Sequence, residues 1–200
     1  MLIHTMQIKS PFLINQDYLP IKLCESLIDI AFVKDDSFFS EHLADERLHA
    51  YIQQLNIQIE THFNTKIKST ISSYDTYDTN VSETHRADNS VFKNGTWYRN
   101  KDIDFTTIIF MKDGNTKPPI DTNTEVFGGK LEFPTFNFSF NPEVGTSITF
   151  PAYPNFLNLF TPPKIGTNHI LRLSHESDIM FEYDHSKFPG TMNDWFKHLT

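Results

Sequence analysis

The chain has 200 residues, of which 38% are hydrophobic and 21% charged. This length and composition exclude collagen-like, low-complexity and disulfide-scaffold proteins, and indicate one domain with a sizeable core. The net charge of −8 argues against a general nucleic-acid-binding protein, which needs a cationic surface to neutralise phosphates. Cys24 is the single cysteine, so we expect no internal disulfide and a buried thiol.

Apolar runs and the N-terminal sequence bear on membrane association and export. No apolar run approaches the roughly 18 residues that a membrane-spanning helix needs. Residues Met1–Ser10 lack the basic and apolar blocks of a secretory signal. We therefore expect a protein with no membrane partner that is not exported by a signal peptide.

Two amphipathic helices are predicted in the first third of the chain. Apolar residues recur at helical spacing over Ile21–Val33, and Pro20 stands at the start of that segment. A stronger pattern runs over Leu48–Phe63 at intervals of three and four residues, with Asp45 as a candidate N-cap. Each helix needs a surface to pack against, because only one of its faces is apolar.

From Lys66 onward the hydrophobic period changes to two, which is typical of β-strands. The β-branched and aromatic segment Phe105–Met111 is expected to be a strand buried on both faces. Lys112–Glu125, with its Gly and Pro residues, is expected to be a long loop. Further strands are predicted at Ile67–Ile71 continuing over Thr70–Thr79, Lys130–Pro134 after a Gly-Gly turn, Phe136–Phe140, Gly145–Phe150, His169–Leu173 and Asp178–Tyr183. Helices followed by seven or eight short strands indicate a β sandwich or barrel with helices on one side.

Four segments follow one another in an informative order. They are Thr84–Asn89, Phe105–Phe110, Phe127–Pro134 and Pro142–Pro151. In this order they resemble the prolyl 4-hydroxylase-like branch of the Fe(II)/2-oxoglutarate oxygenases, over roughly residues 12 to 185. The Gly-Gly-x-Leu-x-Phe element and the Pro-x-x-Gly strand are moderately specific, and their order tells more than either motif. The chain is also similar to oxygenase-like proteins of tailed phages of marine bacteria.

The resemblance implies a mainly β fold, a double-stranded β-helix (jelly roll) with two N-terminal helices packed on one sheet. We expect a single domain over residues 1–200, with a helical part (12–64), the jelly roll (66–185) and a C-terminal anchoring segment (186–200). In the family, two histidines and one carboxylate hold Fe(II), leaving positions for 2-oxoglutarate and dioxygen. A basic residue deeper in the barrel pairs with the far carboxylate of 2-oxoglutarate.

The first ligand pair of this family is His-x-Asp, whose side chains share one face of a strand. Here Asp88 is present, but the residue two positions earlier is Arg86, and His85 lies three positions earlier. Two alternatives remain open. On a regular strand Arg86 pairs with Asp88, and the guanidinium repels a metal ion. With a β-bulge near Ala87, His85 and Asp88 would share a face and could bind metal.

The distal ligand and the basic residue also depart from the family pattern. Taking Gly166 as the anchor, the resemblance places Asn158 at the distal histidine position and Asn168 at the basic position. An amide oxygen is a poor exchange for imidazole at Fe(II). Arg172 shares the face of Asn168 and is a weak candidate for cosubstrate binding; a surface or interface charge is the expected alternative. The histidines His169 and His175 are expected near the sheet surface.

Three coinciding departures favour a degenerate oxygenase-like jelly roll that serves as a structural or binding module. In that interpretation no residue is catalytic and no cofactor is bound. The partners are other protein chains of a larger assembly, such as a phage particle, and the chain resides in a virion or in the host cytoplasm. The alternative is an active Fe(II)/2-oxoglutarate-dependent hydroxylase with a substituted triad, in which His85, Asp88 and Asn158 stand at the metal positions.

Aromatic and charged residues suggest where partner chains could bind. Trp97, Tyr98 and Arg99 form either a contact surface, since these residue types are favoured in interfaces, or a loop whose Trp97 covers the core. Trp195 belongs to a short C-terminal helix that packs on the chain's own core or on another chain.

Overall fold

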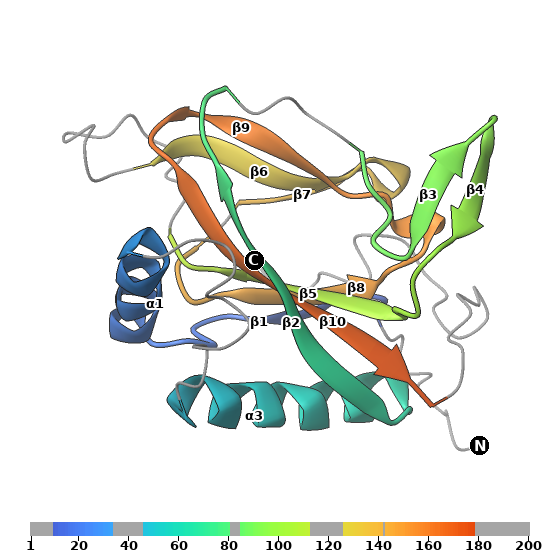
Figure 1. The fold of residues 1–200 in the computed structure, drawn as a ribbon, viewed down its shortest axis with the longest axis horizontal. Coiled ribbons are helices and arrows are strands. Elements are labelled where there is room, and N and C mark those ends of the chain that lie inside the picture. The colour runs from blue at the N-terminus through green and yellow to red at the C-terminus, as the bar shows by residue number, and fades with distance from the viewer. Residues whose placement is uncertain (1–9, 34–45, 81–84, 113–125, 142, 179–200) are drawn as a thin grey trace, which may run out of the picture.

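Two antiparallel sheets, a hairpin and two helices make up the part of the chain that the computed structural model describes, residues 10–33, 46–80, 85–112, 126–141 and 143–178 (Figure 1). The larger sheet has five strands, which neighbour one another in this order: β1 (Leu13–Asn15), β8 (Ser147–Pro151), β5 (Phe105–Phe110), β10 (Asn168–Ser177) and β2 (Ile67–Tyr77). The smaller sheet contains β7 (Phe138–Phe140), β6 (Phe127–Phe133) and β9 (Leu159–Ile165). The hairpin pairs β3 (Ser90–Lys93) with β4 (Thr96–Arg99). This is the predicted mainly β, jelly-roll architecture.

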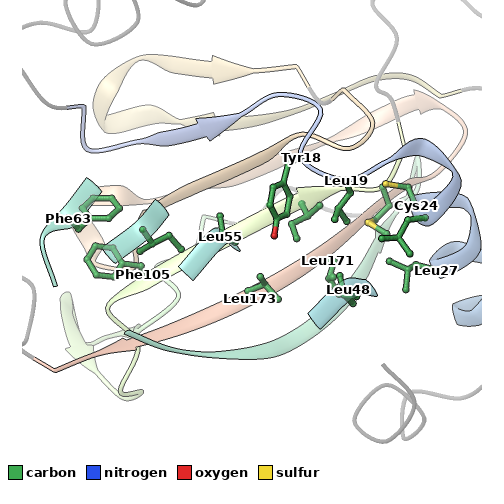
Figure 2. Packing of buried hydrophobic residues seen from close by; sticks show 14 residues of the cluster. Tyr18, Leu19, Cys24, Leu27, Leu48, Leu55, Phe63, Phe105, Leu171 and Leu173 are labelled. Carbon is green, nitrogen blue, oxygen red and sulfur yellow. The ribbon is translucent and has the colours of Figure 1, made fainter. Parts of the chain in front are cut away.

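The two predicted helices are present and pack beside the larger sheet. They are α1 (Ile21–Val33) and α3 (Glu46–Phe63), and Figure 1 shows α3 running along one face of that sheet. Figure 2 shows the core they form, in which Leu48 and Leu55 of α3 meet Leu171 and Leu173 of β10. The thiol of Cys24 is fully buried in the same core, as predicted. The candidate cap Asp45 lies outside the described residues.

A second, largely aromatic core fills the space between the two sheets. It gathers buried Phe residues from both sheets and from the connections, and Phe12 packs edge-on against Phe133 with ring centroids 4.8 Å apart. Successive side chains of a strand point to opposite faces, so one strand of the larger sheet can serve both cores. On β10, Ile170 belongs to the inter-sheet core, whereas Leu171 and Leu173 belong to the helix-covered core.

The structure corrects several predicted strand limits. The strand predicted to end at Leu173 continues to Ser177 and forms β10 (residues 168–177). Of the strand predicted over Asp178–Tyr183, residues 179–183 lie outside the described part. Strand β9 was not predicted, because Pro162 and Pro163 argue against a strand interior. The short edge strand β1 was also missed. The Gly-Gly pair is not a turn before β6 but lies inside it, with Gly128 and Gly129 at φ +76° and +78° and a register shift beside them.

The Phe136–Phe140 segment is also divided differently from the prediction. Pro134–Phe136 is a 3₁₀ turn, and only Phe138–Phe140 is a strand. The three Phe side chains of the predicted stripe are partly buried against the inter-sheet core, as a core stripe requires. Strand β5 is buried along its whole length, as predicted, because helices cover one face and the smaller sheet the other. The rest of the predicted loop, residues 113–125, lies outside the described residues.

The segment around Trp97, for which a contact surface and a loop were the two alternatives, forms the β3–β4 hairpin. Its turn residues Asn94 and Gly95 both have positive φ, of 50° and 80°. Two central residues with positive φ give a type I′ turn, for which Asn-Gly is the preferred sequence. The Asn-Gly pair was a sequence signal for this hairpin that the prediction missed. Within the described residues, no helix is both long enough and apolar enough to cross a membrane.

Candidate functional site

A carboxylate clamped by two guanidinium groups lies where the resemblance places the metal ligands. The side chain of Asp88 is only 4% exposed. Arg86 Nε donates a hydrogen bond to Asp88 Oδ1 at 2.9 Å, and Arg172 Nη1 donates to both carboxylate oxygens, at 3.3 and 3.1 Å. The predicted pairing of Arg86 with Asp88 is therefore present, and Arg172 adds a second cation.

Asn158 stands beside this carboxylate, in the position that the resemblance gave to the distal ligand. Its backbone pairs with that of Arg86 through two hydrogen bonds of 2.9 and 3.0 Å, which hold residues 86–88 against the segment leading into β9. Its side-chain Nδ2 donates to the Arg86 carbonyl at 3.2 Å and to Asp88 Oδ2 at 3.4 Å. The amide of Asn158 thus points its donor, rather than its oxygen, at the carboxylate.

The prediction of a surface or interface position for Arg172 was wrong. The side chain is 3% exposed, because Arg172 shares the inter-sheet face of β10 with Ile170. Besides Asp88, its Nε donates to Asp75 Oδ2 on the neighbouring strand β2 at 3.4 Å. Arg172 lies four residues along the strand from Asn168, which stands at the expected basic position. Its long side chain nevertheless brings the guanidinium to Asp88. An arginine within the apolar run Ile170–Leu173 was the signal for this buried partner.

The charges in this cluster stabilise one another. Burial alone would raise the pKa of Asp88, but the guanidinium groups of Arg172 and then Arg86 outweigh it, so the pKa lies below its usual range. Burial likewise acts to lower the pKa of Arg172, and the Asp88 carboxylate outweighs it, so that pKa is raised. The cluster is therefore a buried ion pair at neutral pH, with Asp88 as an anion.

The residues present do not fit an Fe(II) ion. A two-histidine, one-carboxylate site needs two imidazoles and a carboxylate with a free oxygen. Arg86 and Asn158 take the imidazole positions, and both oxygens of Asp88 accept hydrogen bonds from guanidinium groups. His85 is exposed, and Asp88 pairs with Arg86, as expected for the alternative without a bulge. In the described part of the chain, no three His, Cys, Asp or Glu side chains gather closely enough to hold a metal ion.

The cosubstrate position is equally altered. Asn168 has no charge, its amide group packs over Gly129, and both of its polar side-chain atoms are buried without a hydrogen-bond partner among the described residues. Arg172, the weak candidate for cosubstrate binding, already donates hydrogen bonds from Nη1 to Asp88 and from Nε to Asp75. Arg172 is the one Lys or Arg residue of β10, and its guanidinium already has these two acidic partners.

The two histidines of β10 are buried on the helix-covered face, which corrects their predicted place near the sheet surface. His175 is fully buried, with Nδ1 2.6 Å from Ser69 Oγ and Nε2 2.7 Å from Thr107 Oγ1. Burial lowers its pKa to about 3. His169 has Nδ1 2.6 Å from Tyr74 Oη, and burial lowers its pKa to about 4. Both rings are therefore neutral, hydrogen-bonded parts of the core.

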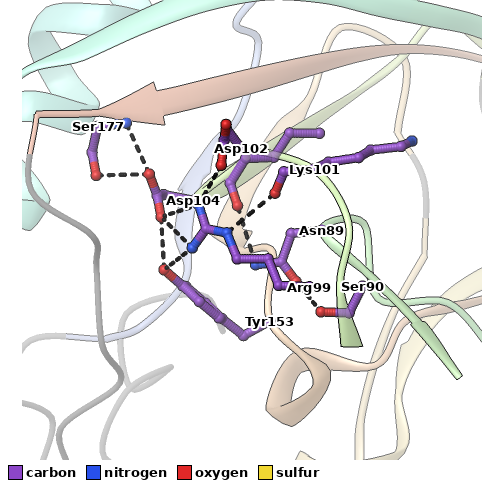
Figure 3. A network of polar contacts seen from close by, with 9 residues as sticks. Asn89, Ser90, Arg99, Lys101, Asp102, Asp104, Tyr153 and Ser177 are labelled. Atoms are coloured by element: carbon purple, nitrogen blue, oxygen red, sulfur yellow. Dashed lines mark hydrogen bonds and ion pairs between the residues drawn. The ribbon is translucent and has the colours of Figure 1, made fainter. Parts of the chain in front are cut away.

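A separate polar network fixes the base of the hairpin (Figure 3). Asp104 Oδ1 accepts hydrogen bonds from Tyr153 Oη at 2.7 Å and from Arg99 at 3.3 Å. Asp104 Oδ2 accepts from the backbone and the hydroxyl of Ser177, at 3.0 and 2.9 Å. Of the predicted interface residues, Arg99 thus ties β4 to the end of β10, while Trp97 is half-buried and Tyr98 is exposed. Trp195 lies outside the described residues.

Comparison with known proteins identifies the fold. No protein-family model and no curated protein matches the sequence. Among solved structures, the viral collagen prolyl hydroxylase of Paramecium Bursaria Chlorella virus-1 is similar with a TM-score of 0.63 and 16% identity, over 85% of this chain and 91% of that one. Another structure of that hydroxylase, a 2-oxoglutarate complex, has a TM-score of 0.59 at 17% identity, over 83% and 96% of the two chains. A Pseudomonas putida prolyl-4-hydroxylase has a TM-score of 0.56 at 14% identity, over 83% and 88%.

Proposed function

We propose that this chain is a degenerate Fe(II)/2-oxoglutarate oxygenase-like domain that acts as a structural or binding module rather than as an enzyme. The fold is that of the prolyl 4-hydroxylases, and at these identities the likeness extends to the fold alone. The function then depends on the residues of the site.

One observation carries the proposal: Asp88, the carboxylate at the expected metal position, is neutralised by protein cations. Arg172 Nη1 contacts both oxygens of Asp88, and Arg86 Nε contacts one of them. A metal ion would have to displace guanidinium groups from a buried carboxylate and would find an arginine and an asparagine in place of two imidazoles. Drawing Asp88 away from buried Arg172 leaves the guanidinium with Asp75 as its remaining acidic partner, which is unfavourable for a buried cation.

The direct test is anaerobic titration of the purified chain with Fe(II) and 2-oxoglutarate, followed by admission of oxygen and detection of succinate. We expect no saturable Fe(II) binding and no succinate above the level of a metal-only control. Stoichiometric Fe(II) binding, or succinate formed with turnover, would contradict the proposal and favour the active hydroxylase with a substituted triad.

A reversion series sharpens the test. Arg86→His with Asn158→His restores both missing imidazoles, but Arg172 remains on Asp88. Adding Arg172→Thr frees the carboxylate. We expect Co(II), a spectroscopic probe of imidazole and carboxylate ligands, to bind the triple variant at one ion per chain, and the parent and double variants much more weakly. A double variant that binds Co(II) as well as the triple variant does would show that Arg172 has no part in excluding metal.

The assembly role, including a place in a phage particle, is part of the same proposal. Its support is the sequence resemblance to phage proteins together with a fold that has lost the groups of its usual chemistry. The test is quantitative mass spectrometry of purified particles, in which the chain should be found at a fixed ratio to the major structural proteins. A chain that is absent from the particles and is found free in the infected host cell would contradict that role.

A further inference from the structure

The tip of the β3–β4 hairpin holds the one Asn-Gly pair of the sequence, Asn94-Gly95. Lys93 pairs with Thr96, so these two residues make up the whole turn. Both are exposed, and their φ angles are +50° and +80°. Apart from the neighbouring residues, none of the described atoms lies within 4 Å of the point where a Cβ of Gly95 would stand. The turn therefore projects into solvent with free space around the Gly95 backbone.

A glycine that follows an asparagine allows the backbone to react with the side chain. The nitrogen of Gly95 attacks Cγ of Asn94, so that an N–C bond forms, and the side-chain amide leaves as ammonia together with the Gly95 amide proton. Water then opens the cyclic imide at either of its carbonyl groups and yields aspartate or isoaspartate. The reaction consumes water alone, and no electrons are transferred. Glycine hinders it least, because no Cβ stands beside the attacking nitrogen.

Two other asparagines share the left-handed backbone of Asn94 but not its surroundings. Asn64 and Asn137 are exposed and have φ angles of +54° and +48°. Each is followed by a residue with a Cβ, and the N–H after Asn64, that of Thr65, donates to the Glu60 carbonyl at 3.3 Å. For the Gly95 N–H, by contrast, the described part of the chain contains no hydrogen bond. Asn64 and Asn137 are therefore internal controls for the reactivity of Asn94.

The hairpin permits the local rotation that ring closure requires. Its strands have four residues each, and a two-stranded hairpin is marginally stable by itself. Its base is fixed, because Arg99 bonds Asp104 and the Asn89 side chain donates to the Ile103 carbonyl at 3.1 Å. The tip can therefore open while the base and the sheets stay folded.

We propose that Asn94 deamidates spontaneously in the folded protein and that the product changes the hairpin. Residues 90–101 contain three Lys and Arg residues and no Asp or Glu, so each event lowers the charge of this segment from +3 to +2. Isoaspartate also adds a methylene group to the main chain. A type I′ turn of two residues between paired strands has no room for the added atom, so the strand pairing is lost at the tip. The inference goes beyond the proposed function and does not depend on the Asp88 cluster.

The first test is incubation of the purified full chain at physiological temperature, followed by peptide mapping. The tryptic peptide Asn94–Arg99 should gain about 1 Da, and fragmentation distinguishes aspartate from isoaspartate. We expect Asn94 to react at least about tenfold faster than Asn64 and Asn137 in the same sample, because a Cβ hinders the attack at those two sites. The rate should rise from mildly acid to mildly alkaline pH, since the attacking nitrogen must lose its proton.

The second test follows the hairpin itself. Trp195→Phe leaves Trp97 as the single tryptophan. Trp97 is paired with Phe92 across the hairpin, with ring centroids 5.2 Å apart, so its fluorescence reports on the strand pairing. We expect this fluorescence to change in step with the formation of isoaspartate. Asn94→Gly is the matched control, because Gly-Gly also suits a type I′ turn and has no side-chain amide. Its fluorescence should stay constant over the same incubation.

Three results would overturn the inference. One is a peptide Asn94–Arg99 that keeps its mass in the folded chain while the urea-unfolded chain deamidates, which would show that the hairpin protects Asn94. Another is deamidation of Asn64 or Asn137 as fast as that of Asn94. The third is unchanged Trp97 fluorescence in a chain that has formed isoaspartate. None of these results bears on Fe(II) binding or succinate formation, so the deamidation and the absence of iron chemistry fail separately.

Discussion

The two faces of β10 bury polar side chains that differ in charge: one face buries a cation and the other buries neutral rings. On the inter-sheet face Arg172 is buried as a cation, with Asp88 and Asp75 as its partners. On the helix-covered face His175 is buried without charge, with the hydroxyl groups of Ser69 and Thr107 as its partners. A buried charge needs an opposite charge, whereas a neutral ring needs only hydrogen bonds. The polar cluster on one face of β10 is therefore held by ion pairs and the cluster on the other face by neutral hydrogen bonds. Substitutions in the two clusters should lower the stability by different amounts.

The largest effect is expected at the charged cluster. Asp88→Ala leaves Arg172 buried without its main partner and should lower the free energy of unfolding by about 3–5 kcal/mol. Urea denaturation followed by circular dichroism measures the change. Asp102→Ala, which removes a carboxylate whose side chain is 96% exposed, is the control and should leave the midpoint unchanged.

The same cluster gives a double-variant check. Replacing Asp88 by Asn together with Arg172 by Met removes both charges, so the loss should be much smaller than the sum of the two single losses. Additive losses would show that Asp88 and Arg172 do not interact energetically, which the ion pair at 3.1 Å contradicts.

A smaller effect is expected at the neutral cluster. Thr107→Val keeps the shape but removes the hydroxyl that faces His175 Nε2 at 2.7 Å and Thr149 Oγ1 at 2.6 Å. Leaving a buried polar atom unpaired costs about 1–3 kcal/mol. Thr70→Val, at an exposed position of β2, is the control, and equal losses in the two variants would argue against the network.

The pH dependence separates the two clusters. The pKa values of His175 and His169 are lowered to about 3 and about 4, from about 6.5 in the unfolded chain. Below pH 6.5 the unfolded chain therefore binds protons that the folded chain does not, and stability falls by roughly 1 kcal/mol per pH unit for each histidine down to its folded pKa. The pKa of Asp88 is also lowered, so its contribution is lost only at more acid pH, below the ordinary aspartate value.

Urea midpoints measured from pH 7.5 to pH 4 check the part of this dependence that belongs to the histidines. His175→Gln removes one titrating ring and should flatten the decline between pH 6.5 and pH 4, although it also costs stability at pH 7 by altering the hydrogen bonds. A variant with the same slope as the parent would show that His175 takes up its proton in the folded state.

The smallest effect is expected for an ion pair outside both clusters. Lys66 and Glu60 join the end of α3 to the start of β2, and the Lys66 side chain is 73% exposed. Because water screens such a pair, Glu60→Gln should leave the melting temperature within error. A clear loss of stability would show that proximity alone, without burial, decides the strength of ion pairs in this protein.

The sequence by itself determined the elements whose pattern is local. Helical spacing identified Ile21–Val33 with the limits that α1 has, and the β-branched run identified the fully buried strand β5. The ordered motifs indicated the jelly roll, and the residues at positions 86 and 158 already departed from the expected ligands, although His85 with a β-bulge remained open as an alternative ligand. These inferences need only neighbours along the chain and the chemistry of each side chain.

Tertiary structure decided which groups are paired and which are buried. Pairing of Arg172 with Asp88 joins residues 84 positions apart, and no local pattern encodes that contact. The long apolar stretch of β10 gave no sign of which face the helices would cover, so the burial of His169 and His175 was misjudged. Strand β9 forms despite its prolines because β6 supplies the pairing that propensity disfavours. Burial and long-range pairing are properties of the packed sheets. They decide that, behind a family-like order of motifs, the Asp88 carboxylate is paired with arginine.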